Sequence, residues 1–255
     1  MEEIKIHEFE FDLINEYFTE LERQGPGSPE ETIRALSFIG NLSKKAKIAD
    51  LGCGTGTQTM VLAQNTAATI TALDLYAGSI DKLNITAKNH SLQNRVTGIV
   101  GSMDNLPFQN GEFDLIWSEG AIANIGFEKG LKYWKHFLKT DGYVAVTYES
   151  WFTEERPAEI EKWWVDAVPE IATIAHNITI LQNTGYIPVA AFILPERCWI
   201  DNYFIPQKVR QEEFLKKHAG NKTVEDMISF MRREADLYSK YKQYYGYVFY
   251  IGKKI

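Results

Sequence analysis

The chain has 255 residues, of which 45% are hydrophobic and 24% are charged, a balance that excludes a disordered segment and indicates a globular fold. Its formal net charge of -7 argues against a nucleic-acid partner, because nucleic-acid affinity rests largely on Lys and Arg. The most apolar run, residues 187–194, is shorter than the ~20 residues that a membrane-spanning helix needs. We therefore expect no membrane insertion.

The N-terminal residues are acidic and amphipathic, without the basic start and apolar stretch of an export signal. Cys53 and Cys198 form no disulfide framework, and neither lies in a metal-ligand spacing. The five histidines are scattered, unlike zinc ligands. These features predict a cytoplasmic protein without a bound metal, and they are compatible with a homodimer.

The first 40 residues are expected to form helices that cover the domain. Apolar residues between positions 9 and 18 recur at helical spacing, which favours a packed helix. A second helix should begin after Ser28, because Ser28 can cap it, Pro29 suits its first turn and Glu31 completes a capping box.

Strand and helix patterns then alternate as far as residue 148. The expected strands are residues 47–51, 69–74, 96–101, 113–118 and 143–148, and the expected helices follow Gly56 and cover about 79–90 and 127–139. Such alternation predicts a doubly wound α/β fold, with a parallel sheet between two layers of helices.

The final third has a different pattern. A helix is expected at about 171–184, a strand at 187–194, two long helices at about 208–219 and 223–244, and a closing strand from 245. We interpret the chain as one domain, with cover helices in 1–40, a core in 41–194, a lid-like helical insertion in 195–245 and the last strand in 246–255.

The most specific motif is Asp50-Leu51-Gly52-Cys53-Gly54-Thr55-Gly56, at the end of the first expected strand. Its glycines allow a tight turn close to a ligand, and the helix that follows offers free N–H groups. No GK[ST] sequence follows, which argues against a phosphate-binding Walker loop. The third glycine of a dinucleotide fingerprint would fall on Thr57, so NAD is the weaker choice.

Two aspartates lie at the same predicted edge of the sheet. Asp74 ends the second strand, near the ~20-residue distance at which an acidic residue reaches ribose hydroxyls. Asp104 follows Ser102 and Met103 in the loop after the third strand, where it could accept a hydrogen bond from an adenine amino group. An ordinary cap or solvated aspartate is the alternative for Asp104.

With these residues in place, the sequence resembles the class I S-adenosylmethionine-dependent methyltransferases, and within them the small-molecule branch that includes the ubiquinone/menaquinone biosynthesis enzymes. The resemblance covers roughly residues 47–148. It implies S-adenosylmethionine as cofactor and a small-molecule acceptor. It also implies a cofactor site made of Asp50, Gly52, Cys53, Gly54, Gly56, Asp74, Leu75, Ser102, Met103, Asp104, Ser118 and Glu119.

The resemblance also implies the arrangement of the sheet. It predicts seven strands with the last one antiparallel, so that residues 187–194 and 245–252 would be neighbours although the helical insertion separates them. The segment 23–28 is similar to a loop that closes over the amino-acid end of the cofactor.

Candidate bases for the transfer are Glu119, Tyr148 and His176, needed only if the acceptor arrives protonated. Candidate acceptor-pocket residues are Arg23, Trp151, Trp199 and Tyr203, since aromatic faces suit a flat or cationic acceptor. Packing is the alternative for the aromatic residues. The sequence leaves three alternatives open: a non-catalytic S-adenosylmethionine-binding protein, a protein methyltransferase and a nicotinamide oxidoreductase.

Overall fold

A single mixed sheet organises the molecule. The computed structural model describes residues 9–40 and 42–255; residues 1–8, which include His7 and the start of the expected acidic N-terminal segment, lie outside them. The sheet has the order β3-β2-β1-β4-β5-β8-β7, with a short β6 beside β5. The strands are β1 (Lys47–Leu51), β2 (Thr69–Asp74), β3 (Val96–Val100), β4 (Phe113–Ser118), β5 (Leu138–Trp151), β6 (Ala172–Thr173), β7 (Tyr186–Ile193) and β8 (Tyr245–Lys254).

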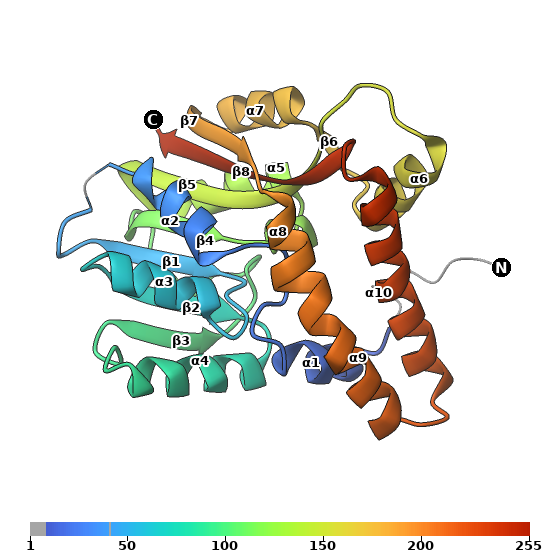
Figure 1. The fold of residues 1–255 in the computed structure, drawn as a ribbon. Coiled ribbons are helices and arrows are strands. Elements are labelled where there is room, and N and C mark those ends of the chain that lie inside the picture. The colour runs from blue at the N-terminus through green and yellow to red at the C-terminus, as the bar shows by residue number, and fades with distance from the viewer. Residues whose placement is uncertain (1–8, 41) are drawn as a thin grey trace.

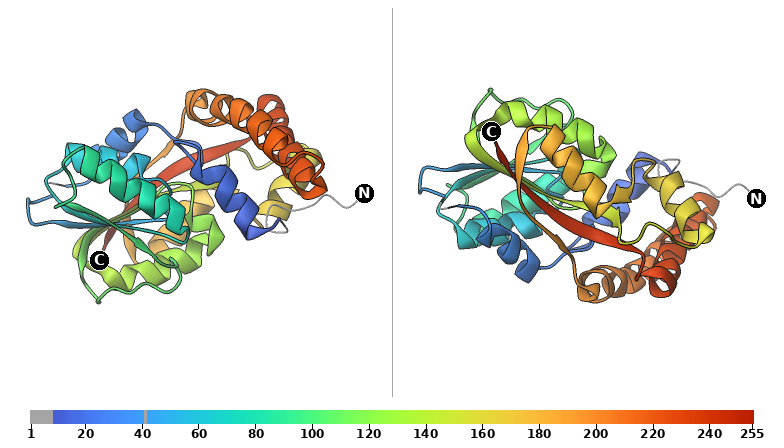
Figure 2. Two further views of the ribbon diagram at one scale, coloured as in Figure 1. Left: turned by 90° about the horizontal axis from the view of Figure 1, so that it is seen from below. Right: turned by 90° about the horizontal axis from the view of Figure 1, so that it is seen from above.

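Strands β1 to β5 are parallel, and β8 runs antiparallel between β5 and β7. Helices cover both faces of this sheet (Figures 1 and 2). One face carries α2 (Pro29–Ser37), α3 (Thr57–Asn65) and α4 (Ala77–Asn89); the other carries α5 (Phe127–Trp134) and α7 (Ile174–Asn183). Two hydrophobic cores therefore form, one on each side of the strands.

The remaining helices gather at the edge of the sheet where the parallel strands end (Figure 1). They are α1 (Phe11–Thr19), α6 (Ala158–Ala167), α8 (Glu196–Trp199), the π-helical turn η4 (Ile200–Phe204), α9 (Ile205–Lys217) and α10 (Lys222–Tyr241). Short 3-10 turns, η2 (Ile122–Asn124) and η3 (Lys135–Phe137), flank α5. Buried apolar residues of α1 form a third core with α9 and α10, so the first helix and the late insertion pack as one layer.

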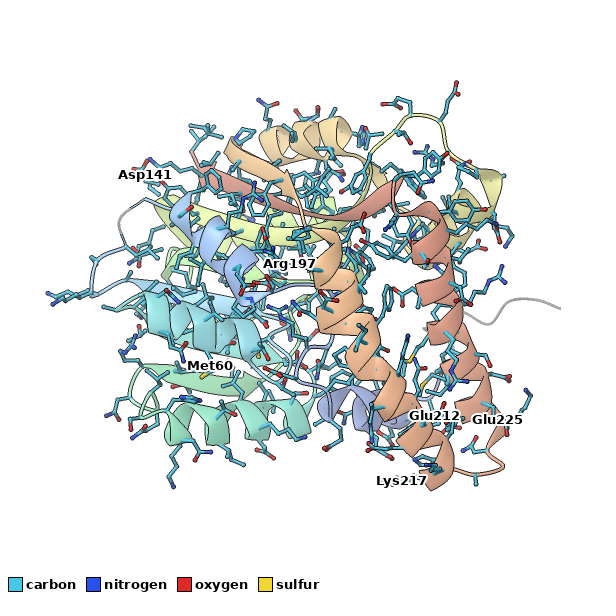
Figure 3. All side chains as sticks on the ribbon, viewed as in Figure 1. Met60, Asp141, Arg197, Glu212, Lys217 and Glu225 are labelled. Atoms are coloured by element: carbon cyan, nitrogen blue, oxygen red, sulfur yellow. The ribbon has the colours of Figure 1, made fainter. Side chains whose placement is uncertain are left out.

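The expected doubly wound fold is confirmed, including the antiparallel neighbours β7 and β8. The sheet has eight strands instead of the expected seven, because the short β6 pairs with the end of β5. The Ser28 cap acts as expected: the Ser28 hydroxyl accepts a hydrogen bond from the Glu31 amide at 3.3 Å. The expected capping box is not completed, because the Glu31 carboxylate pairs with Arg34 and with Arg197, which extends from α8 toward α2 (Figure 3).

Sequence analysis did not identify α6 or β6. Helix α6 buries Ile160, Trp163 and Trp164, which recur at helical spacing. Strand β6 has two residues and pairs with the end of β5, too short for alternation of apolar and polar residues to reveal it.

Candidate functional site

The glycine loop connects β1 to α3 and turns through backbone conformations that favour glycine. Gly52 has φ +70°, and a Cβ there would lie 2.3 Å from the Cβ of Ala121. Gly56 caps α3 with φ +90°, and a Cβ there would lie 2.7 Å from Leu83. Both the dihedral angle and the lack of space require glycine at these two positions.

Asp74 ties this loop to the end of β2. One carboxylate oxygen accepts a hydrogen bond from the Gly54 amide at 2.8 Å, and the other accepts one from the Tyr76 amide at 3.0 Å. Burial raises the pKa of Asp74, while these backbone donors lower it. These two bonds hold the carboxylate in place as a hydrogen-bond acceptor at the carboxyl edge of the sheet, where open α/β sheets bind ligands.

Asp50 lies beneath the loop and is fully buried. One of its oxygens accepts a hydrogen bond from the Thr59 hydroxyl at 2.6 Å, and the other has no hydrogen-bond partner among the described residues. Burial raises the pKa of Asp50 to about 7. Ser118 is also fully buried, and its hydroxyl donates to the Leu51 carbonyl at 2.8 Å. Both side chains support the turn from below.

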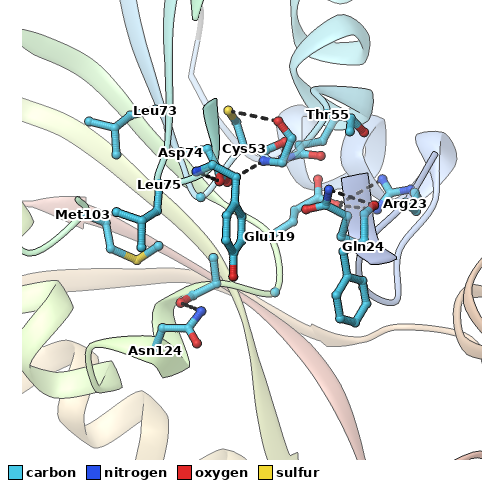
Figure 4. A pocket seen from close by; sticks show the side chains of 18 of the residues that line it. Arg23, Gln24, Cys53, Thr55, Leu73, Asp74, Leu75, Met103, Glu119 and Asn124 are labelled. Atoms are coloured by element: carbon cyan, nitrogen blue, oxygen red, sulfur yellow. Dashed lines mark hydrogen bonds and ion pairs between the residues drawn. The ribbon is translucent and has the colours of Figure 1, made fainter. Parts of the chain in front are cut away.

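A cavity of about 600 Å³ opens above the loop, within the size range of small-molecule sites. Figure 4 shows Asp74, Met103 and Glu119 around it. Most of the predicted cofactor residues line this cavity: Gly52, Cys53, Gly54, Asp74, Leu75, Ser102, Met103, Asp104 and Glu119. Asp50, Gly56 and Ser118 are not among its lining residues. The role of each residue toward a cofactor stays a prediction.

Helix α1 forms part of the cavity wall, which sequence reasoning missed. Phe9, Phe11, Ile14 and Phe18 line the cavity, and the ring of Phe11 lies 4.7 Å from that of Tyr76 after β2. Their spacing indicated a helix correctly, but it was interpreted as packing alone. A helical face cannot reveal from its own sequence whether it covers a core or a ligand.

An ion pair closes the other side of the cavity. Arg23 donates to one Glu119 oxygen from two guanidinium nitrogens, at 3.2 and 3.3 Å. The second oxygen accepts hydrogen bonds from Thr32 at 2.6 Å and from the Trp117 indole at 3.0 Å. Figure 4 shows Arg23 directed at Glu119. Both Glu119 oxygens therefore accept hydrogen bonds, and these bonds fix the position of the side chain.

The late insertion holds the loop that carries Arg23. The Gly27 carbonyl accepts a hydrogen bond from Asn202 at 2.8 Å, and the Gly27 amide donates to the Cys198 carbonyl at 3.4 Å. A Cβ on Gly27 would lie 2.2 Å from an Arg23 guanidinium nitrogen. Glycine at this position therefore leaves the space that the ion pair occupies.

The other two candidate bases lie away from the lining of the cavity. Tyr148 is buried, its ring stacks on Phe127 at 4.6 Å, and its hydroxyl has no hydrogen-bond partner among the described residues. Burial raises the pKa of Tyr148 well above its usual range. His176 is exposed in the first turn of α7. Their role as bases stays a prediction.

Among the predicted acceptor residues, Arg23 and Tyr203 line the cavity. Trp151 and Trp199 belong to the neighbouring buried aromatic cluster; Trp199 stacks on Tyr238 at 4.5 Å. Within residues 9–40 and 42–255, no group of three or more His, Cys, Asp or Glu side chains is arranged to hold a metal ion. In the same ranges, no helix combines the length and apolarity needed to cross a membrane.

The glycine loop lies in a part of the chain that is similar to a known protein family. Residues 48–142, which contain the loop, Asp74 and Asp104, match a family described as a methyltransferase domain. This part of the chain is therefore similar to a methyltransferase domain.

Solved structures share the fold of nearly the whole chain. A methyltransferase from Geobacter sulfurreducens, in complex with S-adenosyl-L-homocysteine, superposes with a TM-score of 0.82 over 96% of this chain and 98% of the other, at 15% identity. A methyltransferase from Thiobacillus denitrificans, also with S-adenosyl-L-homocysteine, has a TM-score of 0.80 over 96% and 98%, at 17% identity.

Two curated relatives match over little more than a third of this chain. A glycine/sarcosine/dimethylglycine N-methyltransferase of Actinopolyspora halophila is 26% identical over 38% of this chain, and a probable tocopherol O-methyltransferase of Oryza sativa is 31% identical over 35%. The matches span 17% and 25% of those proteins' own length.

Proposed function

We propose that the protein transfers a methyl group from S-adenosylmethionine to a small-molecule acceptor. The observation that carries this proposal is the glycine loop held by Asp74 beneath a cavity of about 600 Å³. The relatives named for glycine, sarcosine and tocopherol methylation support a small acceptor, and so does the net charge of -7. The ubiquinone/menaquinone branch is part of the same proposal.

The residues present fit the cofactor. In our proposal the backbone of Gly52 and Gly54 lies along its amino-acid part, the Asp74 carboxylate accepts from the ribose hydroxyls, and Leu75 and Met103 contact the adenine ring. All five line the cavity. S-adenosylmethionine, when bound, supplies a methyl group on a positively charged sulfur.

The protein's own contribution is orientation and exclusion of water. Helix α1 covers one side of the cavity and the Arg23–Glu119 pair closes another, so that an acceptor can be held in a fixed position. Since both Glu119 oxygens already accept hydrogen bonds, we propose that Glu119 positions Arg23 and the loop around it.

The cysteines bear on where the protein acts. Cys53 and Cys198 are both free and buried, which supports a reducing, cytoplasmic environment. Burial raises the pKa of the Cys53 thiol well above its usual range. That shift supports a packing role for Cys53 and argues against a nucleophilic one.

Calorimetric titration tests the cofactor. We expect S-adenosylhomocysteine to bind and NADH not to bind; tight binding of NADH alone would overturn the proposal in favour of an oxidoreductase. Incubation with S-adenosylmethionine and a panel of small amines, phenols, thiols and carboxylates then tests the reaction. Formation of S-adenosylhomocysteine that depends on one acceptor supports an enzyme, whereas binding without turnover supports a binding protein.

A further inference from the structure

The loop between α1 and α2 contacts the start of α3 at the edge of the proposed cofactor cavity. The Glu22 carbonyl accepts hydrogen bonds from the Thr55 and Thr57 hydroxyls, at 3.0 and 2.6 Å. The next residue, Arg23, lines the same cavity as Thr55 and Thr57 (Figure 4). Two segments that are far apart in the sequence are therefore joined beside the cavity, and both contribute residues to its wall.

Arg23 has a buried donor that its ion pair does not use. The side chain is 9% exposed, and both outer guanidinium nitrogens donate to the same Glu119 oxygen. The third nitrogen, Nε, is buried and has no hydrogen-bond partner among residues 9–40 and 42–255. A buried donor without an acceptor is costly. An acceptor atom of a ligand bound in the cavity would remove that cost.

The first turn of α3 offers further donors to the same space. Backbone N–H groups in the first turn of a helix have no acceptor within the helix, and the helix dipole places partial positive charge there. The N-cap residue Gly56 supplies no side-chain cap, and the first turn contains no acidic residue. Thr57 and Gln58 of this turn line the cavity. Such a helix N-terminus favours an anionic ligand group.

These donors fit a carboxylate better than other polar groups. The Arg23 Nε–H and the amides of α3 can only donate, so the ligand group must accept hydrogen bonds from both. A carboxylate has two oxygens for this purpose, and its charge strengthens each bond. Glu119 already gives the guanidinium one negative charge. A singly charged carboxylate therefore fits this site better than a doubly charged phosphate.

We propose that Arg23 Nε and the first turn of α3 form a carboxylate subsite of the cavity. The inference rests on the proposed function and adds how one charged group of a ligand is recognised. The carboxylate belongs either to the amino-acid part of the cofactor or to the methyl acceptor, and the same donors serve both sources. Arg23 is then a ligand-binding residue, and Glu119 positions its guanidinium.

Two ligands that differ only at the carboxylate test the cofactor as its source. They are S-adenosylhomocysteine and its carboxamide, which keeps the shape of the group and removes its charge. If the cofactor is the source, calorimetry on the unmodified protein should give at least about tenfold weaker binding for the carboxamide, the scale of a hydrogen bond to a charged group. Arg23→Lys keeps a positive charge beside Glu119 but removes Nε–H, and it should abolish most of this preference.

Two further pairs test the methyl acceptor as the source, in protein saturated with S-adenosylhomocysteine. The pairs are acetate with acetamide and 3-phenylpropionate with 3-phenylpropanamide. If the acceptor is the source, at least one carboxylate should bind about tenfold more tightly than its amide, and Arg23→Lys should again abolish the preference. No preference for a carboxylate in any of the three pairs would overturn the inference, as would a preference that Arg23→Lys leaves unchanged.

Arg34→Lys is the matched control. The Arg34 side chain is 50% exposed and pairs with Glu31 on α2, so this variant should change none of the affinities. The comparison of each carboxylate with its amide on the unmodified protein needs no variant, and it tests the inference even if Arg23→Lys does not fold.

The design separates the two proposals. If the unmodified protein binds neither S-adenosylhomocysteine nor its carboxamide, the proposed function fails. If it binds both equally and prefers no carboxylate among the acceptor probes, only the carboxylate subsite fails.

Discussion

Arg23 and Glu119 form a buried ion pair, with Nη2 and Oε2 3.2 Å apart, that joins the loop after α1 to the end of β4. The two side chains are 9% and 3% exposed, so water screens the pair little. Thr32 and Trp117 bind the remaining carboxylate oxygen. One carboxylate therefore holds together the N-terminal helices, the parallel sheet and the entrance loop.

Removal of the Glu119 charge should destabilise the protein strongly. Glu119→Gln leaves the Arg23 guanidinium buried without a counter-charge, and loss of one partner of a buried pair costs about 3 to 5 kcal/mol. Urea unfolding measures the change. Glu128→Gln, which breaks the exposed Lys132–Glu128 pair, is the control and should cost less than about 1 kcal/mol. Similar losses of unfolding free energy in both variants would show that the Arg23–Glu119 pair is well solvated.

Asp74→Ala should weaken binding of S-adenosylhomocysteine by about 1 to 3 kcal/mol, the scale of hydrogen bonds to a charged group. Part of the loss would come from the glycine loop, because Asp74 also accepts the Gly54 amide. Calorimetric titration checks the value, with Asp81→Asn on the exposed side of α4 as control. Unchanged affinity would show that the ribose is held elsewhere.

Gly52→Ala should destabilise the fold more than Gly111→Ala. The two glycines have similar positive φ values, +70° and +66°, but a Cβ would meet Ala121 at position 52 and nothing within 4 Å at position 111. Strain of about 1 kcal/mol is common to both, and overpacking adds about 1 to 3 kcal/mol at position 52 alone. Equal unfolding free energies would mean that the loop relaxes around the added methyl group.

The free energy of unfolding should fall as pH rises through the range in which Glu149 on β5 and Glu234 on α10 ionise. In the folded protein the pKa of Glu149 is raised to about 7 and that of Glu234 to about 8, from an ordinary value of 4.5. The folded state therefore binds more protons than the unfolded state between these values, and its free energy of unfolding decreases with increasing pH. The decrease levels off above the folded pKa values.

Glu234→Gln should reduce the loss of unfolding free energy that occurs as pH rises. The midpoint temperatures of thermal unfolding are expected to be similar for the variant and the unmodified protein at pH ~4.5, and higher for the variant at pH ~8. Burial also raises the pKa values of Asp50 and Asp74. Their contributions to the pH dependence cancel in this comparison, because both proteins contain them. Parallel pH profiles would show that Glu234 is solvated in the folded protein.

Local sequence determined most elements of the fold and indicated the kind of ligand that the glycine loop binds. The alternation of strands and helices predicted the doubly wound sheet, and DLGCGTG with Asp74 and Asp104 indicated the cofactor. These features can be predicted from sequence because side-chain periodicity and backbone freedom are properties of neighbouring residues.

Only the tertiary structure decided which distant residues meet. The Arg23–Glu119 pair joins positions 96 residues apart. Helix α1 likewise became a cavity wall through its packing on α9 and α10. The pairing and burial of a charged side chain depend on the path of the whole chain, and no spacing within one segment carries that information.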